Sequence, residues 1–266
     1  MKMLTFAKRC GREILRDPLN LVFGLGFPVV LLLLLSAIQA NVPVDLFAIE
    51  HLAPGISVFG LSFMTLFSAT LIARDRESAL LQRLYATPLM PADFILGYLL
   101  PMVPIALAQS AVCYLVAILL GLPVSGKILI AITAQLPMAV FYISLGLLCG
   151  SLCNVKQVGG ICGALLTNLS AWLSGVWFDL DLLGKNFGKI ANCLPFVHAV
   201  ELERAVILGN YRPALQQFYP VLGFGLVTLL CAVLLFLRQM KRQRCADQMA
   251  HPLIFPGAFS IISVKT

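Results

Sequence analysis

Residues 21–38 read LVFGLGFPVVLLLLLSAI, an uncharged run in which nearly every side chain is apolar. A helix rises about 1.5 Å per residue, so about 20 such residues cross the roughly 30 Å hydrocarbon core of a bilayer. The run therefore predicts a transmembrane helix. Uncharged stretches of comparable length recur along the chain, and together they predict six spans: 18–44, 52–73, 94–122, 128–154, 158–178 and 218–237.

The composition favours an all-α integral membrane protein. Of the 266 residues, 60% are hydrophobic and 12% are charged, which is about half the charged fraction of a soluble domain. The charges cluster between the apolar stretches and leave little sequence for a water-soluble catalytic domain. We expect residues 1–266 to form a single transmembrane domain with a cytoplasmic tail at 238–266.

The net charge of +7 reflects membrane topology rather than nucleic-acid binding. Basic residues gather at the two ends of the chain and in one internal loop, without the interleaved aromatic residues of a nucleic-acid surface. Because Lys and Arg near span ends stay in the cytoplasm, we compared the two possible orientations. With both termini inside, 14 of the 19 basic residues are cytoplasmic. The pattern predicts a multi-pass protein of the cytoplasmic membrane with both termini in the cytoplasm and no nucleic-acid partner.

Residues 1–17 predict an amphipathic helix ahead of the first span. At about 100° per residue, the apolar and polar side chains separate onto two faces. Such a helix lies along the inner membrane surface in contact with lipids; a plain basic anchor is the alternative. The apolar face holds Met3, Leu4, Phe6, Ala7, Cys10, Ile14 and Leu15, and the polar face holds Lys8, Arg9, Arg12, Glu13 and Arg16.

A second cytoplasmic segment, ARDRESALLQRLYATPLMPADF at residues 73–94, connects spans two and three. Leu80, Leu81, Leu84 and Tyr85 share one stripe of a short helix, whereas Asp75, Arg76, Gln82 and Arg83 point elsewhere. Pro88 bends the chain before it re-enters the membrane. This helix is well placed to transmit force into the membrane; a solvated loop helix is the alternative.

The sequence shows little catalytic chemistry. The centres of the spans carry no ionisable residue, whereas ion-driven carriers use such residues. The external acid pairs Asp179 with Asp181 and Glu201 with Glu203 are two residues apart, which points the members of each pair in different directions on a helix and favours solvated surface. Of the eight cysteines most lie in apolar stretches and indicate packing residues. We expect no enzyme activity, no metal site and no cofactor in this chain.

Three segments carry a resemblance to a known family. They are RDRESALLQRLYATPLMPADFILGYLL at 74–100, LSGVWFDLDLL at 173–183 and NCLPFVHAVELERAVILG at 192–209. The chain resembles the permease subunits of ABC exporters of the second type, which export drugs, polysaccharides and lipids. One departure is that Cys193 and Leu194 separate Asn192 from Pro195 in the part of the chain that is similar to the family's external Asn-Pro region.

The resemblance implies a function and a set of sites. The permease would work as a pair of copies or paralogues with two copies of a cytoplasmic ABC ATPase, a separate polypeptide that binds ATP and magnesium. Residues 3–17 would be the connecting helix and the segment after span two the coupling helix. The resemblance assigns ATPase coupling to Arg74, Glu77, Arg83, Leu84, Thr87 and Pro88, and the substrate path to Phe63, Thr65, Thr167 and Asn168.

Three other functions remain open at this stage. The leading alternative is an ion-coupled or facilitative carrier that acts without an ATPase, and the absence of charge in the span centres argues against the ion-coupled form. A membrane enzyme would need a catalytic constellation, and a membrane scaffold would not transport. The residues leave the substrate open.

Overall fold

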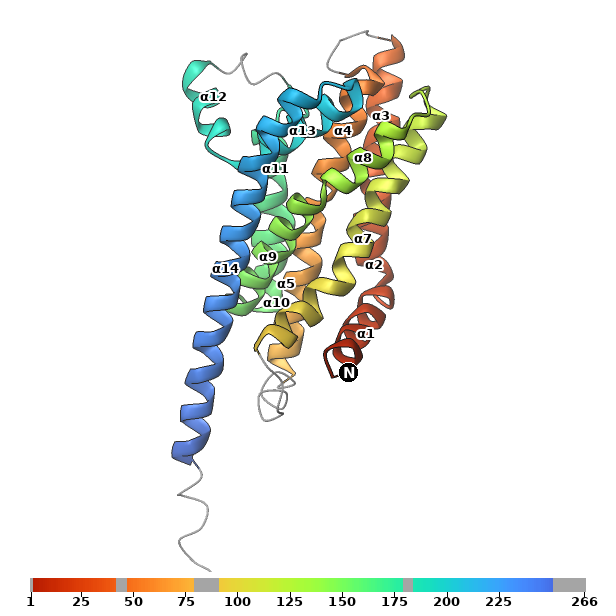
Figure 1. The fold of residues 1–266 in the computed structure, drawn as a ribbon. Coiled ribbons are helices and arrows are strands. Elements are labelled where there is room, and N and C mark those ends of the chain that lie inside the picture. The colour runs from red at the N-terminus through yellow and green to blue at the C-terminus, as the bar shows by residue number, and fades with distance from the viewer. Residues whose placement is uncertain (1, 42–46, 79–90, 179–183, 251–266) are drawn as a thin grey trace, which may run out of the picture.

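The computed structural model describes residues 2–41, 47–78, 91–178 and 184–250, and this part of the chain is helical and holds no strand. Figure 1 shows the helices packed side by side in an elongated bundle. The elements are α1 Lys2–Leu15, α2 Pro18–Leu21, η1 Val22–Gly26, α3 Phe27–Asn41, α4 Ile49–Gly60, α5 Ser62–Glu77, α7 Pro91–Leu119, α8 Gly126–Ala134, α9 Leu136–Leu152, α10 Val155–Val158, η3 Gly159–Leu166, α11 Thr167–Leu173, α12 Lys185–Asn192, α13 Pro195–Leu208 and α14 Tyr211–Ala250.

Five helical stretches in the described residues are long and apolar enough to cross a membrane. The helix over 155–173, which overlaps the fifth predicted span, is not among them; Lys156, Gln157 and Asn168 lower its mean hydropathy. An all-α integral membrane fold is therefore confirmed, and the count of six spans remains a prediction. The five stretches are Val22–Asn41, Ile49–Glu77, Asp93–Leu119, Gly126–Leu152 and Tyr211–Met240.

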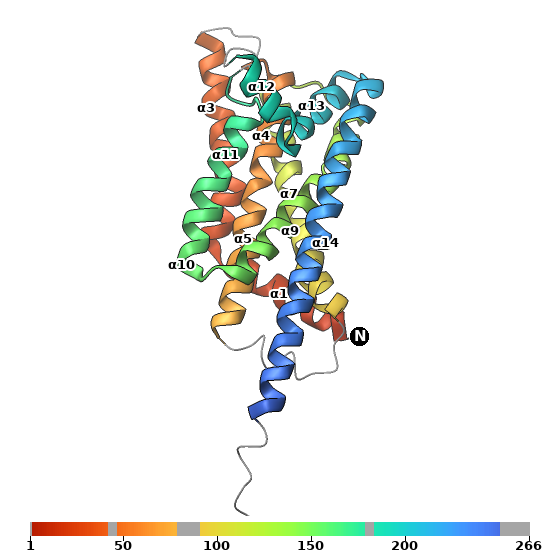
Figure 2. The ribbon, with the colours of Figure 1, turned by 90° about the vertical axis from the view of Figure 1, so that its left-hand side faces the viewer.

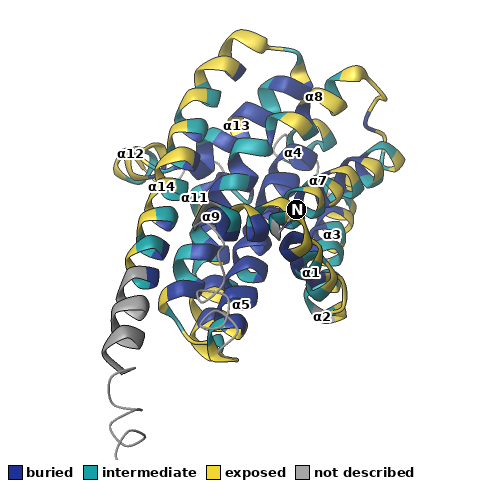
Figure 3. Ribbon diagram, turned by 60° about the horizontal axis from the view of Figure 1, so that its bottom comes forward, coloured by how far each residue is buried: buried dark blue, intermediate teal, exposed yellow. Residues whose placement is uncertain are grey.

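The stretch that forms α4 and α5 lies at the centre of the bundle. Nearly all of its residues are buried, whereas the other membrane-length stretches are mostly exposed or half-buried. Figure 3 shows this contrast, with α5 and α9 largely buried and α14 exposed along one side. Large apolar side chains such as Leu34, Leu115 and Leu230 are exposed on the outer helices. An exposed apolar belt of this kind fits a lipid environment.

Close packing of α5 on α9 depends on two glycines. A Cβ atom at Gly146 would lie 1.9 Å from Ser68 Oγ and 2.4 Å from the Thr65 carbonyl oxygen, and one at Gly150 would lie 2.4 Å from the Ala69 carbonyl oxygen. The spacing Gly146-x-x-x-Gly150 places both on one face of α9. Small residues at this spacing let two membrane helices approach closely.

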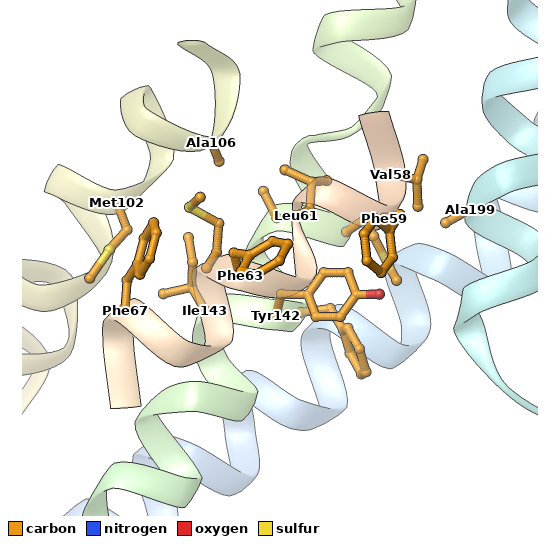
Figure 4. Close-up of a cluster of buried hydrophobic side chains, with 14 of the residues drawn as sticks. Val58, Phe59, Leu61, Phe63, Phe67, Met102, Ala106, Tyr142, Ile143 and Ala199 are labelled. Atoms are coloured by element: carbon orange, nitrogen blue, oxygen red, sulfur yellow. The ribbon is translucent and has the colours of Figure 1, made fainter. Parts of the chain in front are cut away.

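Aromatic side chains fill the space around this contact. Figure 4 shows Phe59, Phe63, Phe67 and Tyr142 among the buried apolar residues between the central helices. Phe59 and Phe63 meet edge to face with their ring centroids 5.9 Å apart. Such contacts fix the orientation of the rings as well as burying apolar area.

The two ends of the bundle differ. In Figures 1 and 2, α1 and the end of α14 lie at one end, and α8, α12 and α13 lie at the other. We call the first the α1 end. Over its described residues, the segment between the fifth and sixth predicted spans forms α12, α13 and the first turns of α14.

The structure contradicts one sequence prediction about the connection between spans two and three. Asp75 and Arg76 do not belong to a separate loop helix but extend α5, which continues to Glu77. The Asp75 carboxylate is buried rather than on a solvated face. The leucine stripe that predicted the loop helix lies outside the described residues.

Candidate functional site

An aromatic groove opens on the side of the bundle between the first predicted span and η3–α11. Its volume is about 450 Å³. Phe27 meets Phe63 edge to face at 5.7 Å, and Phe59 meets Trp177 at 5.9 Å, so rings from three segments form its wall. The groove is lined by Phe23, Phe27, Phe59, Phe63, Gly163, Thr167, Asn168, Ala171, Trp172, Trp177 and Phe178.

The polar lining of this groove is sparse and partly used by its own helix. The Thr167 hydroxyl donates to the Cys162 carbonyl at 3.0 Å, and the Asn168 amide donates to the Ala164 carbonyl at 2.7 Å. Both side chains keep oxygen atoms that accept further hydrogen bonds. Two π-helical turns, η1 and η3, supply Phe23 and Gly163 to the lining. Such turns often occur at functional sites in membrane and soluble helices.

Three of the four residues predicted on the substrate path meet in this groove, and Thr65 does not. Its side chain is fully buried, and its hydroxyl donates to the Tyr142 carbonyl at 2.9 Å. Thr65 therefore faces α9 and belongs to the contact between α5 and α9.

At the α1 end, the last turn of α5 holds a buried ion pair. Two guanidinium nitrogens of Arg9 donate to the Asp75 carboxylate at 2.7 and 2.6 Å, and the Tyr98 hydroxyl donates to it at 2.7 Å. The Asp75 side chain is 2% exposed, and Arg9 also pairs with Glu13 at 2.6 Å. The hydrogen bonds that Arg9 donates to Asp75 raise the pKa of the guanidinium above its ordinary value. A buried carboxylate needs such partners, so this pair fixes α1 to α5 and α7.

The neighbours of Asp75 in the sequence bind other parts of the α1 end. Arg74 pairs with Asp17 at 2.9 Å. Arg76 donates to the carbonyls of Ser151 and Cys153 at the end of α9. We call residues 74–77 the α5 terminal turn.

Glu77 completes the turn from the opposite side. Its carboxylate accepts a hydrogen bond of 2.9 Å from the Val155 backbone N–H in the first turn of α10. A negative group is favourable beside the free N–H groups of a helix start. The α5 terminal turn therefore connects the segment after α1 with α9 and α10.

A third cluster is polar and lies deep in the bundle, toward α13. Gln135, between α8 and α9, donates to Ser57 at 2.9 Å and to the Glu203 carboxylate at 3.1 Å, and it accepts from the Ser110 hydroxyl. Tyr114 donates to the same carboxylate oxygen at 2.8 Å. Burial raises the pKa of Glu203, which lies on α13 outside the membrane-length helices, to about 8.

This cluster corrects the interpretation of the second external acid pair as solvated. Glu201 is exposed, but Glu203 is 1% exposed. The spacing of two residues does point the pair apart, and one member faces inward because α13 packs on the bundle. Polar side chains at membrane depth need hydrogen-bond partners. The presence of Gln135, Ser57 and Ser110 in the apolar stretches was therefore the feature of the sequence that could have indicated a buried acid.

Comparison with known proteins shows to which family the chain belongs. A family model described as ABC-2 type transporter matches residues 1–208, which run to the end of α13. The chain belongs to the ABC-2 type transporter family. It is 27% identical over 198 residues to ABC transporter G family member 20 from Dictyostelium discoideum. That alignment covers 70% of this chain and 26% of the relative, so the chain spans about a quarter of the length of the curated protein it matches.

Membership of the ABC-2 type transporter family confirms the resemblance drawn from the sequence, and the apolar helices make this a multi-pass membrane protein. Of the six residues to which that resemblance assigns ATPase coupling, Arg74 and Glu77 lie together in the α5 terminal turn. The other four, Arg83, Leu84, Thr87 and Pro88, lie outside the described residues. Sequence reasoning missed Asp75, because a carboxylate beside three other charged residues is typical of a solvated surface.

Proposed function

We propose that this ABC-2 membrane domain is the permease part of an ATP-driven exporter in the cytoplasmic membrane, with both termini in the cytoplasm. Two copies of an ABC ATPase, which bind ATP and magnesium, act on the α1 end, and a second permease copy or paralogue completes the pathway. The permease is not an enzyme. The coupling segment, residues 74–88, receives the motion of the ATPase, and the aromatic groove forms part of the substrate path.

The observation that carries this proposal is the continuity of α5. Phe63 near its start lines the groove, and Glu77 at its end binds α10. The two are about 21 Å apart along the axis at about 1.5 Å per residue. Because α5 is buried along most of its length, a displacement of its terminal turn moves the groove wall and the neighbouring helices together. A rigid central helix is thus suited to switch access to the groove.

The groove indicates the class of substrate. Its wall is mainly aromatic and apolar, with acceptors from Thr167 and Asn168. Such a surface suits apolar or amphiphilic molecules better than ions or free sugars. A hydrophobic fluorescent dye and a fluorescent phospholipid are therefore suitable transport probes.

The test uses proteoliposomes that hold the permease and its ATPase. We expect export of a probe only with hydrolysable ATP. Glu77→Ala and Leu84→Arg should abolish this export while leaving membrane insertion and ATPase binding measurable. Glu77→Gln keeps an acceptor for the Val155 N–H, so it separates the effect of losing the hydrogen bond from the effect of losing the charge. Glu201→Ala is the matched control, because it removes an exposed carboxylate at the other end of the bundle. Unchanged coupling in both test variants would rule out the assigned coupling segment.

One observation favours the alternative of an ion-coupled carrier, namely the buried Glu203 carboxylate with its Gln135 and Tyr114 partners. Buried acids in transporters often bind or relay protons. The same liposomes distinguish the two functions. Probe transport without ATPase that is lost on addition of a protonophore and in Glu203→Gln would replace the ABC proposal.

A further inference from the structure

An apolar groove of about 730 Å³ lies between α1 and α7 at the α1 end, away from the aromatic groove. Its α7 wall is formed around Leu100, Pro104 and Ala108, and its α1 wall includes Leu4 and Leu15. Leu4, Leu15 and Leu100 are 59%, 64% and 45% exposed, so the groove has no cover in the described chain. We call it the α1–α7 groove.

Close contact of the two helices explains why the groove is preformed. A Cβ at Gly97 would lie 2.2 Å from the Phe6 ring, and one at Gly11 would lie 3.3 Å from Pro101 Cβ. The Arg9–Asp75 pair holds α1 in this position. The groove is therefore a fixed depression in the fold rather than a gap that opens between loose helices.

Basic side chains form one rim of the groove. Lys8 and Arg12 are one helical turn apart, are exposed, and make no ion pair within the described residues. Arg9 differs because its charge is used by Asp75 and Glu13. The rim thus carries two positive charges that the fold leaves available.

A second depression, of about 490 Å³, lies on the other side of this rim. It shares Lys8 and Arg12 with the α1–α7 groove, and Thr5, Arg9 and Arg16 complete its polar lining with Glu13. An apolar channel and a basic pocket that share two cations match a molecule with an apolar chain and an anionic head.

We propose that the α1–α7 groove binds one anionic glycerophospholipid from the leaflet at the α1 end, with an acyl chain against the α7 wall and the phosphate on Lys8 and Arg12. Guanidinium and ammonium groups form charge-assisted hydrogen bonds with phosphate. The acyl chain covers apolar surface between the two helices. The proposal rests on the membrane location of the chain and not on export or on an ATPase.

The charge pattern selects this occupant over a neutral lipid. A zwitterionic phospholipid offers the same chain but carries a compensating positive group, so it gains less from Lys8 and Arg12. Each Lys or Arg close to an anionic membrane surface contributes a few-fold in affinity. Two such residues predict about thirtyfold tighter binding of phosphatidylglycerol than of phosphatidylcholine.

The experiment measures lipid binding to the full-length purified protein by native mass spectrometry, with phosphatidylglycerol and phosphatidylcholine titrated separately. Lys8→Gln with Arg12→Gln should weaken phosphatidylglycerol binding about thirtyfold and weaken phosphatidylcholine binding much less. The matched control Lys156→Gln with Arg212→Gln removes the same charge elsewhere and should leave both lipids unchanged. Ala108→Trp fills the α7 wall and should weaken both lipids while the cations remain.

Each arm decides one part of the proposal. Equal binding of the two lipids, or full binding in the Lys8 and Arg12 variant, overturns the anionic site. Full binding in Ala108→Trp overturns the acyl-chain position. Displacement of the lipid by free glycerol 3-phosphate at equal concentration would show a site for a soluble phosphate instead. Unaltered burial of Cys10, tested by resistance to maleimide, verifies that α1 remains docked in every variant.

Discussion

Among individual side chains, Asp75 connects α1 to α5 and α7 by accepting hydrogen bonds from Arg9 and Tyr98. Asp75→Asn replaces the buried carboxylate that accepts from Arg9 and Tyr98 with a neutral amide. It should destabilise the protein by about 2 kcal/mol, because charge-assisted hydrogen bonds are lost while Arg9 stays partly exposed and paired with Glu13. Burial raises the pKa of the adjacent Cys10 thiol to about 12, so the thiol is unreactive at pH 8. In the variant, we expect a lower Tm and rapid maleimide labelling of Cys10, read by peptide mass spectrometry.

The matched control for Asp75 is Glu201→Gln, which removes an exposed carboxylate and should change stability by less than about 0.5 kcal/mol. In a double-mutant cycle with Arg9→Gln, the effects should be strongly non-additive. Additive effects, or a Cys10 that stays unreactive in Asp75→Asn, would contradict the role assigned to the pair.

The burial of Glu203 predicts how the stability of the protein depends on pH. Its pKa rises from an ordinary value of 4.5 to about 8 in the folded protein because burial disfavours the charged form. The folded state therefore binds the proton more tightly than the unfolded state. The stability due to this group is fully present below about pH 4.5 and is lost as the pH rises to about 8.

The Glu203→Gln variant tests that sign. Glutamine keeps an acceptor for Tyr114 and Gln135 but does not ionise. The Tm of the native protein minus that of the variant should fall between pH 5 and pH 8, measured by thermal unfolding in a fixed detergent. A difference that rises with pH over this window would contradict the buried neutral acid.

Between elements, the contact of α5 with α9 depends on Gly146. Gly146→Ala places a methyl group against Ser68 and the Thr65 backbone, so the two helices must separate. Overpacking of this kind costs about 2 kcal/mol, and the Tm should fall accordingly. Because the same contact orders α5, export by the reconstituted permease should also fall.

Gly160→Ala is the control for this prediction. A Cβ at Gly160 meets nothing within 4 Å. The change should therefore be neutral, or raise stability by about 0.5 kcal/mol because alanine lowers the conformational entropy of the unfolded chain. Equal Tm values for the two alanine variants would contradict the role of Gly146 as a packing position.

The helices illustrate what the sequence could and could not predict. Apolar length alone predicted membrane-crossing helices, because backbone polar groups in a bilayer must be paired within the helix. The spacing of Phe6, Cys10 and Ile14 predicted an apolar face on the first helix, and in the structure these side chains are buried, with Phe6 against α7. Arg9, assigned to the polar face, is partly exposed but also reaches the buried Asp75 carboxylate. Its partner Asp75 is 66 residues away, and a pairing over that separation depends on how α1 crosses α5 and α7. The same holds for Glu203, whose partners Tyr114 and Gln135 come from α7 and from the junction of α8 and α9.

For the whole molecule, the two ends of the helical bundle should lie on opposite sides of the membrane. Ser78 follows α5 at the α1 end, and Ser125 precedes α8 at the opposite end; both are exposed. The excess of basic residues predicts that the α1 end lies in the cytoplasm. Ser78→Cys and Ser125→Cys are closely matched substitutions, so their labelling compares location rather than chemistry.

In intact cells, a membrane-impermeant maleimide should label Ser125→Cys and leave Ser78→Cys unlabelled until the membrane is permeabilised. The native exposed Cys193, which follows α12, should be labelled with Ser125→Cys, and its replacement by Ser gives the background for both. Labelling of Ser78→Cys from outside would place the α5 terminal turn away from the cytoplasmic ATP on which the proposed ATPase depends. This result would rule out any mechanism in which that turn receives motion from an ATP-hydrolysing partner. The lipid site on α1 would remain possible, but it would face the other leaflet.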